Sequence, residues 1–216
     1  MSALQLAVIP VTPFQQNCTV IQCAATKQCV VIDPGGEIER VQAAIDELGG
    51  QLSAIWITHG HLDHAGGTAA LQRETGVDIY GPHQDDKFWI DLMPMQAQQF
   101  GFGQAEIFTP TRWLVHGDTV TVGEITFQVI HCPGHTPGHV VFFQPEARLA
   151  IVGDVIFRGS VGRTDFPRGD FNDLKSSIRD RLFPLGDDVT FLCGHGPNST
   201  FGEERQRNPY VGDDAI

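Results

Sequence analysis

Four short apolar segments of this sequence each lead into a histidine or an aspartate. They are rich in β-branched and aromatic residues and stop at glycine, proline or threonine, which is typical of buried strands. The segments, each with the residue that follows it, are 54–57 with His59, 127–130 with His135, 149–152 with Asp154 and 189–193 with His195. Because the carboxyl ends of strands in an open α/β sheet gather along one edge, we expect these four side chains to meet.

Segments with helical spacing lie between the predicted strands. Apolar residues recur at helical intervals over 38–48 and over 174–182, and a third helix is expected over about 67–74. Further strands are predicted at 29–32 and 139–143, and at 118–122 paired with 125–130 across a Gly-Glu turn. The pattern predicts a layered α/β sandwich, formed as one catalytic domain over residues 1–216.

The segment 84–111 contains several aromatic and methionine residues at irregular spacing. We interpret it as a helix followed by a loop between the two halves of the chain, in a position to overhang a site. Core filling is the alternative role of its aromatic side chains.

The formal net charge of −12 argues against nucleic acid or an anionic membrane as a partner, since both attract basic surfaces. Arg158, Arg163 and Arg168 lie close together with one acid among them, so they form either a locally positive rim or solvated loop positions. The five cysteines contain no C-x-x-C pair, and the first residues do not resemble a leader. We therefore expect a cytoplasmic protein, with a monomer favoured.

The segment 59–64 places three imidazoles and one carboxylate within six residues. Neutral imidazole and ionised carboxylate are suitable ligands for zinc, iron or manganese. In an extended segment, His59 and His61 point the same way and can share one ion, whereas Asp63 and His64 can turn toward a second. A single histidine here would more often be a hydrogen-bonded core residue, but the whole set predicts a site for two metals.

The chain resembles the metallo-β-lactamase superfamily, and specifically its glyoxalase II (hydroxyacylglutathione hydrolase) branch. The resemblance is carried by THGHLDHAGG at 58–67, GHTPGH at 134–139, GDVIFRGSVGRTD at 153–165 and GHG at 194–196. It implies a four-layer αββα sandwich. It also implies one metal on His59, His61 and His135 and a second on Asp63, His64 and His195, with Asp154 bridging the two.

The same resemblance implies further roles for single residues. Asp63 and Asp154 would be catalytic, since they keep the two cations partly neutralised and correctly spaced. His139 is not a ligand in the family pattern, and its role would be either to orient the ligands or to form a structural hydrogen bond. Arg163 aligns with a basic residue that contacts glutathione, but Asp165 stands where longer relatives have an aromatic residue.

The activity implied by the resemblance is hydrolysis of S-lactoylglutathione to lactate and glutathione, a step of methylglyoxal detoxification, by a hydroxide that bridges the two metals. Zinc is the first expectation for both ions, with iron or manganese possible. The longer enzymes have a C-terminal helical extension that helps to hold glutathione, whereas this chain ends 21 residues after His195. Recognition of glutathione is therefore a weaker expectation than metal binding.

Three other functions remain open from the sequence. One is a persulfide dioxygenase, which uses a single iron on the same fold. Another is a hydrolase of the superfamily that acts on a lactone, a lactam or another ester. The third is a non-catalytic interaction module that a metal stabilises, although the intact ligand set argues against it.

Overall fold

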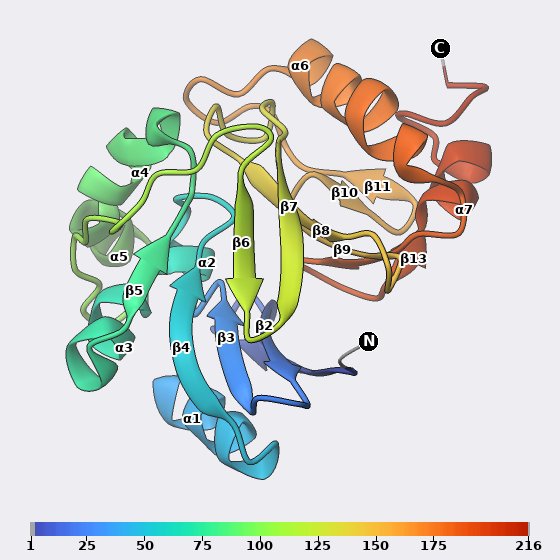
Figure 1. The fold of residues 1–216 in the computed structure, drawn as a ribbon. Helices are drawn as coiled ribbons and strands as arrows, with labels where there is room; N and C mark the ends of the chain where they lie inside the picture. Colours follow the sequence, from blue (N-terminus) through green and yellow to red (C-terminus); the bar gives the residue numbers. More distant parts are fainter. Residues whose placement is uncertain (1–2, 216) are drawn as a thin grey trace.

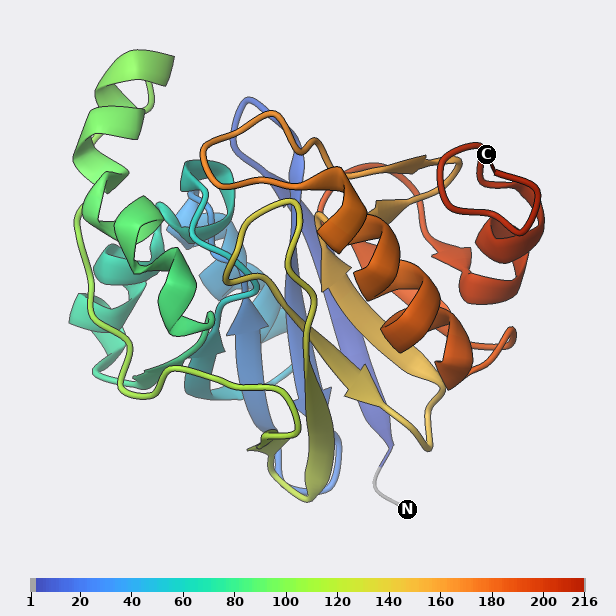
Figure 2. The same cartoon turned by 90° about the horizontal axis from the view of Figure 1, so that it is seen from above.

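Two mixed β-sheets lie face to face between two outer layers of helices, as Figure 2 shows from above. The computed structural model describes residues 3–215. The first sheet contains, in spatial order, β1 (Leu4–Val11), β2 (Gln16–Cys23), β3 (Gln28–Ile32), β4 (Gln51–Trp56) and β5 (Asp78–Tyr80). The second contains β13 (Ser199–Thr200), β12 (Thr190–Cys193), β9 (Leu149–Gly153), β8 (Val140–Gln144), β7 (Ile125–His131) and β6 (Thr119–Val122). The predicted αββα sandwich is confirmed.

The helices cover the two outer faces of this sandwich (Figure 1). On the side of the first sheet are α1 (Ile38–Glu47), α2 (Leu62–Ala65), α3 (Thr68–Thr75), α4 (Lys87–Asp91) and α5 (Met93–Phe100). On the side of the second sheet are α6 (Phe171–Ser176), which continues as a π-helical turn over Ser177–Leu182, and α7 (Phe201–Arg207). Short 3-10 turns occur at Gln84–Asp86 and Phe183–Leu185. The strands β10 (Ile156–Phe157) and β11 (Ser160–Val161) form a small separate hairpin. The two helices predicted from apolar spacing, over 38–48 and 174–182, and the third helix expected over about 67–74 are confirmed.

Three apolar clusters hold the layers together. One lies between the two sheets, where Trp56 packs with its ring centroid 5.3 Å from Phe127 and 5.1 Å from Phe142. The other two lie between each sheet and its helices. Because both faces of the sheets are covered at their centre, strands such as β3, β4 and β9 contain continuous buried apolar runs, which explains why the sequence shows such runs rather than alternation.

The strands predicted from the sequence do not include β1 and β2, which form the N-terminal hairpin of the structure. Strand β2 is almost entirely buried although it carries Gln16 and Gln22, both fully buried. The side-chain Nε2 of Gln22 donates to the Leu48 carbonyl at 3.0 Å, so a contact with the end of α1 pairs the donor end of this buried side chain.

Segment 84–111 forms the helices α4 and α5 followed by an irregular stretch, consistent with the predicted helix and loop. Within residues 3–215, no helix is long and apolar enough to cross a membrane.

We predict that Trp56→Ala lowers the free energy of unfolding by about 3–5 kcal/mol, because it removes the largest side chain between the sheets and leaves a cavity. Urea unfolding followed by circular dichroism measures the change. Val115→Ala is the control, since Val115 is 50% exposed and should change stability by less than about 0.5 kcal/mol. A similar cost for both variants would contradict the packing described.

Candidate metal centre

The loop that leaves β4 brings three histidines to the edge of the first sheet. Thr58 and His59 come one residue after the end of β4, and His61 precedes the short helix α2, which carries Asp63 and His64. Gly60 allows the loop to pass close to α4, since a Cβ atom there would lie 2.7 Å from the Cβ of Trp89. The side chains of His59 and His64 are fully buried.

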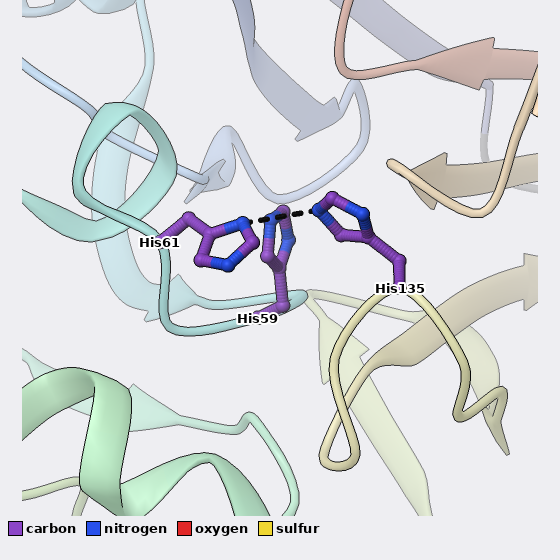
Figure 3. Close-up of side chains that lie close together, drawn as sticks. All are labelled: His59, His61 and His135. Atoms are coloured by element: carbon purple, nitrogen blue, oxygen red, sulfur yellow. Dashed lines mark hydrogen bonds between the residues drawn. The ribbon is translucent and has the colours of Figure 1, made fainter. Parts of the chain in front are cut away.

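The first group of donor atoms belongs to His59, His61 and His135, whose rings converge from two loops (Figure 3). One nitrogen from each ring lies within 4.8 Å of the others. The Nδ1 of His61 is 3.0 Å from the Nε2 of His135. Two ligands of a tetrahedral metal with bonds of ~2.0–2.1 Å lie about 3.3 Å apart, so this spacing suits one cation.

The second group is formed by Asp63, His64 and His195. The Nε2 of His195 is 3.1 Å from the Oδ2 of Asp63, and the Nε2 of His64 is 3.9 Å from the same oxygen. This group joins the start of α2 to the end of β12, two parts of the chain that lie far apart in the sequence.

Asp154 lies between the two groups. Its Oδ1 is 3.2 Å from the Nε2 of His64, and its Oδ2 is 3.5 Å from the Nε2 of His195 and 3.6 Å from the Nε2 of His135. The structure thus brings all seven predicted ligands together, with Asp154 facing both groups. That they hold two metal ions stays a prediction.

The donor set fits divalent cations because several of its atoms are buried without a hydrogen-bond partner. These atoms include the Nε2 of His59, the Nε2 of His64 and the Oδ1 of Asp154. Buried polar atoms are costly unless something satisfies them. Imidazole nitrogen and carboxylate oxygen are ligands of zinc, iron and manganese, so cations of this class would remove that cost.

Hydrogen bonds on the far side of three rings direct their Nε2 atoms into the centre. The Nδ1 of His64 lies 2.8 Å from the Oδ2 of Asp33, that of His135 2.7 Å from the Arg163 carbonyl, and that of His195 3.2 Å from the Phe14 carbonyl. Such outer contacts fix both the tautomer and the orientation of a metal-binding imidazole.

Asp33 connects the two groups of donors. Besides His64, its carboxylate accepts hydrogen bonds from the Thr58 amide at 2.7 Å and the Thr58 hydroxyl at 2.6 Å. The Thr58 hydroxyl is in turn 3.0 Å from the Nδ1 of His59. The site prediction omitted Asp33, although it follows the apolar segment 29–32 just as the predicted ligands follow their own segments.

Asp86 is a second buried carboxylate that the site prediction omitted. It accepts hydrogen bonds from the Gly60 amide at 2.9 Å, the Thr136 hydroxyl at 2.8 Å and the Gly138 amide at 2.6 Å. Burial raises the pKa of Asp86 to about 6, although these three donors oppose the shift. Asp86 therefore ties the loop of His59 to the loop of His135.

His139 lies behind the centre rather than in it. Its Nε2 accepts a hydrogen bond from the Asp154 amide at 3.1 Å, and its ring is stacked on His59 with centroids 4.6 Å apart. The contact suits the orienting role that the sequence suggested, and that role remains our proposal.

The ionisable groups of the centre differ in their pKa shifts. Burial lowers the pKa of His59 and His61 well below the usual imidazole value and lowers that of His135, so these rings are neutral and can act as ligands. Burial acts the same way on His64, but the carboxylates of Asp154 and Asp63 outweigh it and raise the pKa. Burial also disfavours the charged form of Asp154, but the neighbouring imidazoles, led by His64, lower its pKa.

A pocket of 740 Å³ opens onto this centre. Five of the predicted ligands line it, together with a wall of apolar side chains: Phe14, Trp89, Leu92, Met95, Phe100, Phe157, Val161 and Phe166. Helices α4 and α5 supply three of these, and Leu92 between the two helices supplies a fourth, so the segment 84–111 does overhang the site. Such a size and polarity are typical of a small-molecule site.

The three arginines of the expected positive rim have different surroundings. Arg163 lines the pocket, and its guanidinium pairs with Asp165. Arg158 lies 4.0 Å from Glu203, and Arg168 lies over the ring of Phe88 at 5.0 Å. Of the three, only Arg163 is part of the pocket lining.

Another group of possible metal ligands, His83, Asp85 and His131, lies outside the pocket. Its two imidazoles are stacked with their planes at 21°, and each already has a backbone partner. The Nδ1 of His83 accepts from the Asp85 amide at 3.2 Å, and the Nε2 of His131 is 2.8 Å from the Pro137 carbonyl. These contacts support a structural role.

The sequence and the fold of this chain are similar to those of known proteins. The sequence profile of the metallo-beta-lactamase superfamily matches residues 11–195. Hydroxyacylglutathione hydrolase GloC from Haemophilus influenzae is 45% identical over 209 residues, which cover 96% of this chain and 98% of that protein. The crystal structure of BLEG-1 B3 metallo-beta-lactamase is 31% identical, with a TM-score of 0.87 over 96% of this chain and 99% of that one. TTHA1623 in a di-iron-bound form is 35% identical, with a TM-score of 0.86 over 95% of this chain and 100% of that one.

We predict that Asp33→Asn weakens zinc binding by roughly 10- to 100-fold, because the carboxylate that orients ligands of both groups loses an acceptor. Competition with a chromophoric chelator measures the affinity. Glu106→Gln, which alters an exposed ion pair with Arg73, is the matched control and should bind zinc as the unmodified chain does. Unchanged zinc affinity in Asp33→Asn would contradict the orienting role.

Proposed function

Because this chain belongs to the metallo-β-lactamase superfamily and is a metal-dependent hydrolase of it, we propose that it hydrolyses a glutathione thioester, S-lactoylglutathione, to lactate and glutathione. The observation that carries the proposal is the pair of donor groups, joined by Asp154, at a pocket with apolar walls. The similarity to hydroxyacylglutathione hydrolase GloC over nearly the whole chain supports the choice of substrate.

His59, His61 and His135 would hold one cation, Asp63, His64 and His195 the other, and Asp154 would contact both. When bound, a pair of divalent cations makes a water molecule nucleophilic near neutral pH and polarises the carbonyl that it attacks. We expect zinc first, and the similar di-iron-bound structure supports iron as an alternative.

The side chains of the pocket contribute positioning and charge rather than a covalent nucleophile. Cys193 is buried, and burial raises the pKa of its thiol to about 11, so it does not supply a thiolate near neutral pH. Asp63 and Asp154, whose side chains are 16% and 11% exposed, would offset the charge of two cations at this site. The nucleophile is therefore water, as the sequence suggested.

The pocket walls next to the predicted metal centre are apolar. Trp89 and Phe166 contact the ring of His61 with centroids 4.5 and 5.0 Å away, so the space beside the centre is apolar. An apolar wall shields the reacting carbonyl and the departing sulfur from bulk water. Arg163 lines the same pocket and is positioned to contact a glutathione carboxylate.

Two alternatives stay open beside this reaction. A persulfide dioxygenase needs a single iron, whereas the second donor group of Asp63, His64 and His195 favours two cations. Hydrolysis of a lactam, a lactone or another ester is the other alternative, and the similarity to BLEG-1 B3 metallo-beta-lactamase favours the lactam.

We predict that Asp154→Asn lowers kcat/KM for S-lactoylglutathione by more than about 100-fold, since loss of a ligand should cost more than loss of an outer contact. The same variant should retain fewer metal ions per chain than the two expected for the unmodified protein, measured by elemental analysis. Asp213→Asn, an exposed carboxylate near Arg205, is the matched control.

Different outcomes would overturn the proposal. One bound iron, with oxygen uptake on glutathione persulfide, would establish the dioxygenase. Faster turnover of nitrocefin or a homoserine lactone than of S-lactoylglutathione would establish the other class of hydrolase. Two bound metals with no turnover of any of these substrates, together with unfolding of His59→Ala, would favour a structural role for the metals.

A further inference from the structure

Arg163 and Asp165 form a bidentate ion pair next to the predicted metal centre. The Nε of Arg163 donates to the Oδ1 of Asp165 at 2.9 Å, and its Nη2 donates to the Oδ2 at 2.7 Å. This is the geometry in which an arginine binds any carboxylate, including that of a ligand. Asp165 thus occupies the Nε/Nη2 edge, one of the two edges of the guanidinium at which a substrate carboxylate can bind.

Arg163 is fixed in place by contacts that do not involve Asp165. Its carbonyl is 2.7 Å from the Nδ1 of His135, so its backbone is anchored beside the first donor group. Its guanidinium lies over the ring of Phe166, 4.6 Å from the centroid. Loss of the Asp165 carboxylate would therefore leave the guanidinium supported at the pocket.

Apart from the proposed cations, positively charged side chains are scarce at this pocket. Among the described residues that line it, Arg163 is the one lysine or arginine. The whole chain has a formal charge of −12, so its long-range field repels an anionic substrate. A glutathione thioester carries two carboxylates, and Arg163 is the pocket group that can pair with one of them. Asp165 neutralises that group in the free protein.

The pair is weak enough to be displaced. The side chains of Arg163 and Asp165 are 68% and 66% exposed, and exposed ion pairs contribute little because water competes for both partners. Asp165 is not among the residues that line the pocket, so its carboxylate can be replaced without disturbing the pocket walls.

We propose that Asp165 determines substrate specificity by competing with the substrate carboxylate for the guanidinium of Arg163. The inference rests on the proposed function, since it assumes an anionic thioester in the pocket. Asp165 would weaken binding of carboxylate-bearing thioesters and leave neutral thioesters unaffected. The residue acts on binding alone and takes no part in the chemical step.

The test compares Asp165→Asn with the unmodified, metal-loaded protein on two thioesters with the same acyl group. S-lactoylglutathione is anionic, and the lactoyl thioester of N-acetylcysteamine is neutral. We expect KM for S-lactoylglutathione to fall about two- to five-fold with kcat unchanged, the size of effect that an exposed pair allows, and KM for the neutral thioester to stay the same.

The chain offers a matched control in Arg148 and Asp188. This pair has the same bidentate geometry, with the Nε of Arg148 2.8 Å from the Oδ2 of Asp188. Neither residue lines the pocket. Asp188→Asn changes the net charge by the same amount and should leave both KM values unchanged. In an Arg163→Gln background, Asp165→Asn should also have no effect.

Two results would overturn the inference: an unchanged KM for S-lactoylglutathione in Asp165→Asn, or an equal fall in the Arg163→Gln background. If the unmodified protein hydrolyses no glutathione thioester, the proposed function fails separately. The affinity of the same variants for S-methylglutathione is then compared, with tryptophan fluorescence as the measure of binding. Tighter binding by Asp165→Asn supports the inference, and equal binding overturns it.

Discussion

The rest of the structure depends on one constraint: several potential metal-ligand atoms are buried without a hydrogen-bond partner. His59, His64 and Asp154 have such atoms at the edge of the sandwich. Protein interiors avoid unsatisfied polar atoms, so the fold gains from cations there. The two sheets, the loops after β4 and β7 and the end of β12 all bring ligands to this one place.

Two carboxylates outside the ligand set hold the ligand-bearing loops in position. Asp33 orients a ring of each donor group through His64 and, by way of Thr58, His59. Asp86 joins the loop of His59 to that of His135 through three hydrogen bonds. The precision of the centre therefore comes from residues that would touch neither metal nor substrate, as is common for metal sites.

Much of this arrangement can be predicted from the sequence, for identifiable reasons. Each ligand strand is a short apolar run, and its C-terminal end places the next polar residue at the sheet edge. The hairpin of β1 and β2 escapes prediction because β2 carries buried polar residues such as Gln22, whose Nε2 bonds to Leu48, a residue distant in the sequence. Asp86 escapes as well, because it follows another acid, Asp85, and only its tertiary partners distinguish the two.

The central claim is that seven side chains hold two cations with Asp154 between them. Anomalous X-ray diffraction from crystals of the zinc-loaded protein tests it most directly. We predict two anomalous peaks, one ligated by His59, His61 and His135 and the other by Asp63, His64 and His195, both in contact with Asp154. A single peak, or two peaks of which one lies away from these side chains, would contradict the account.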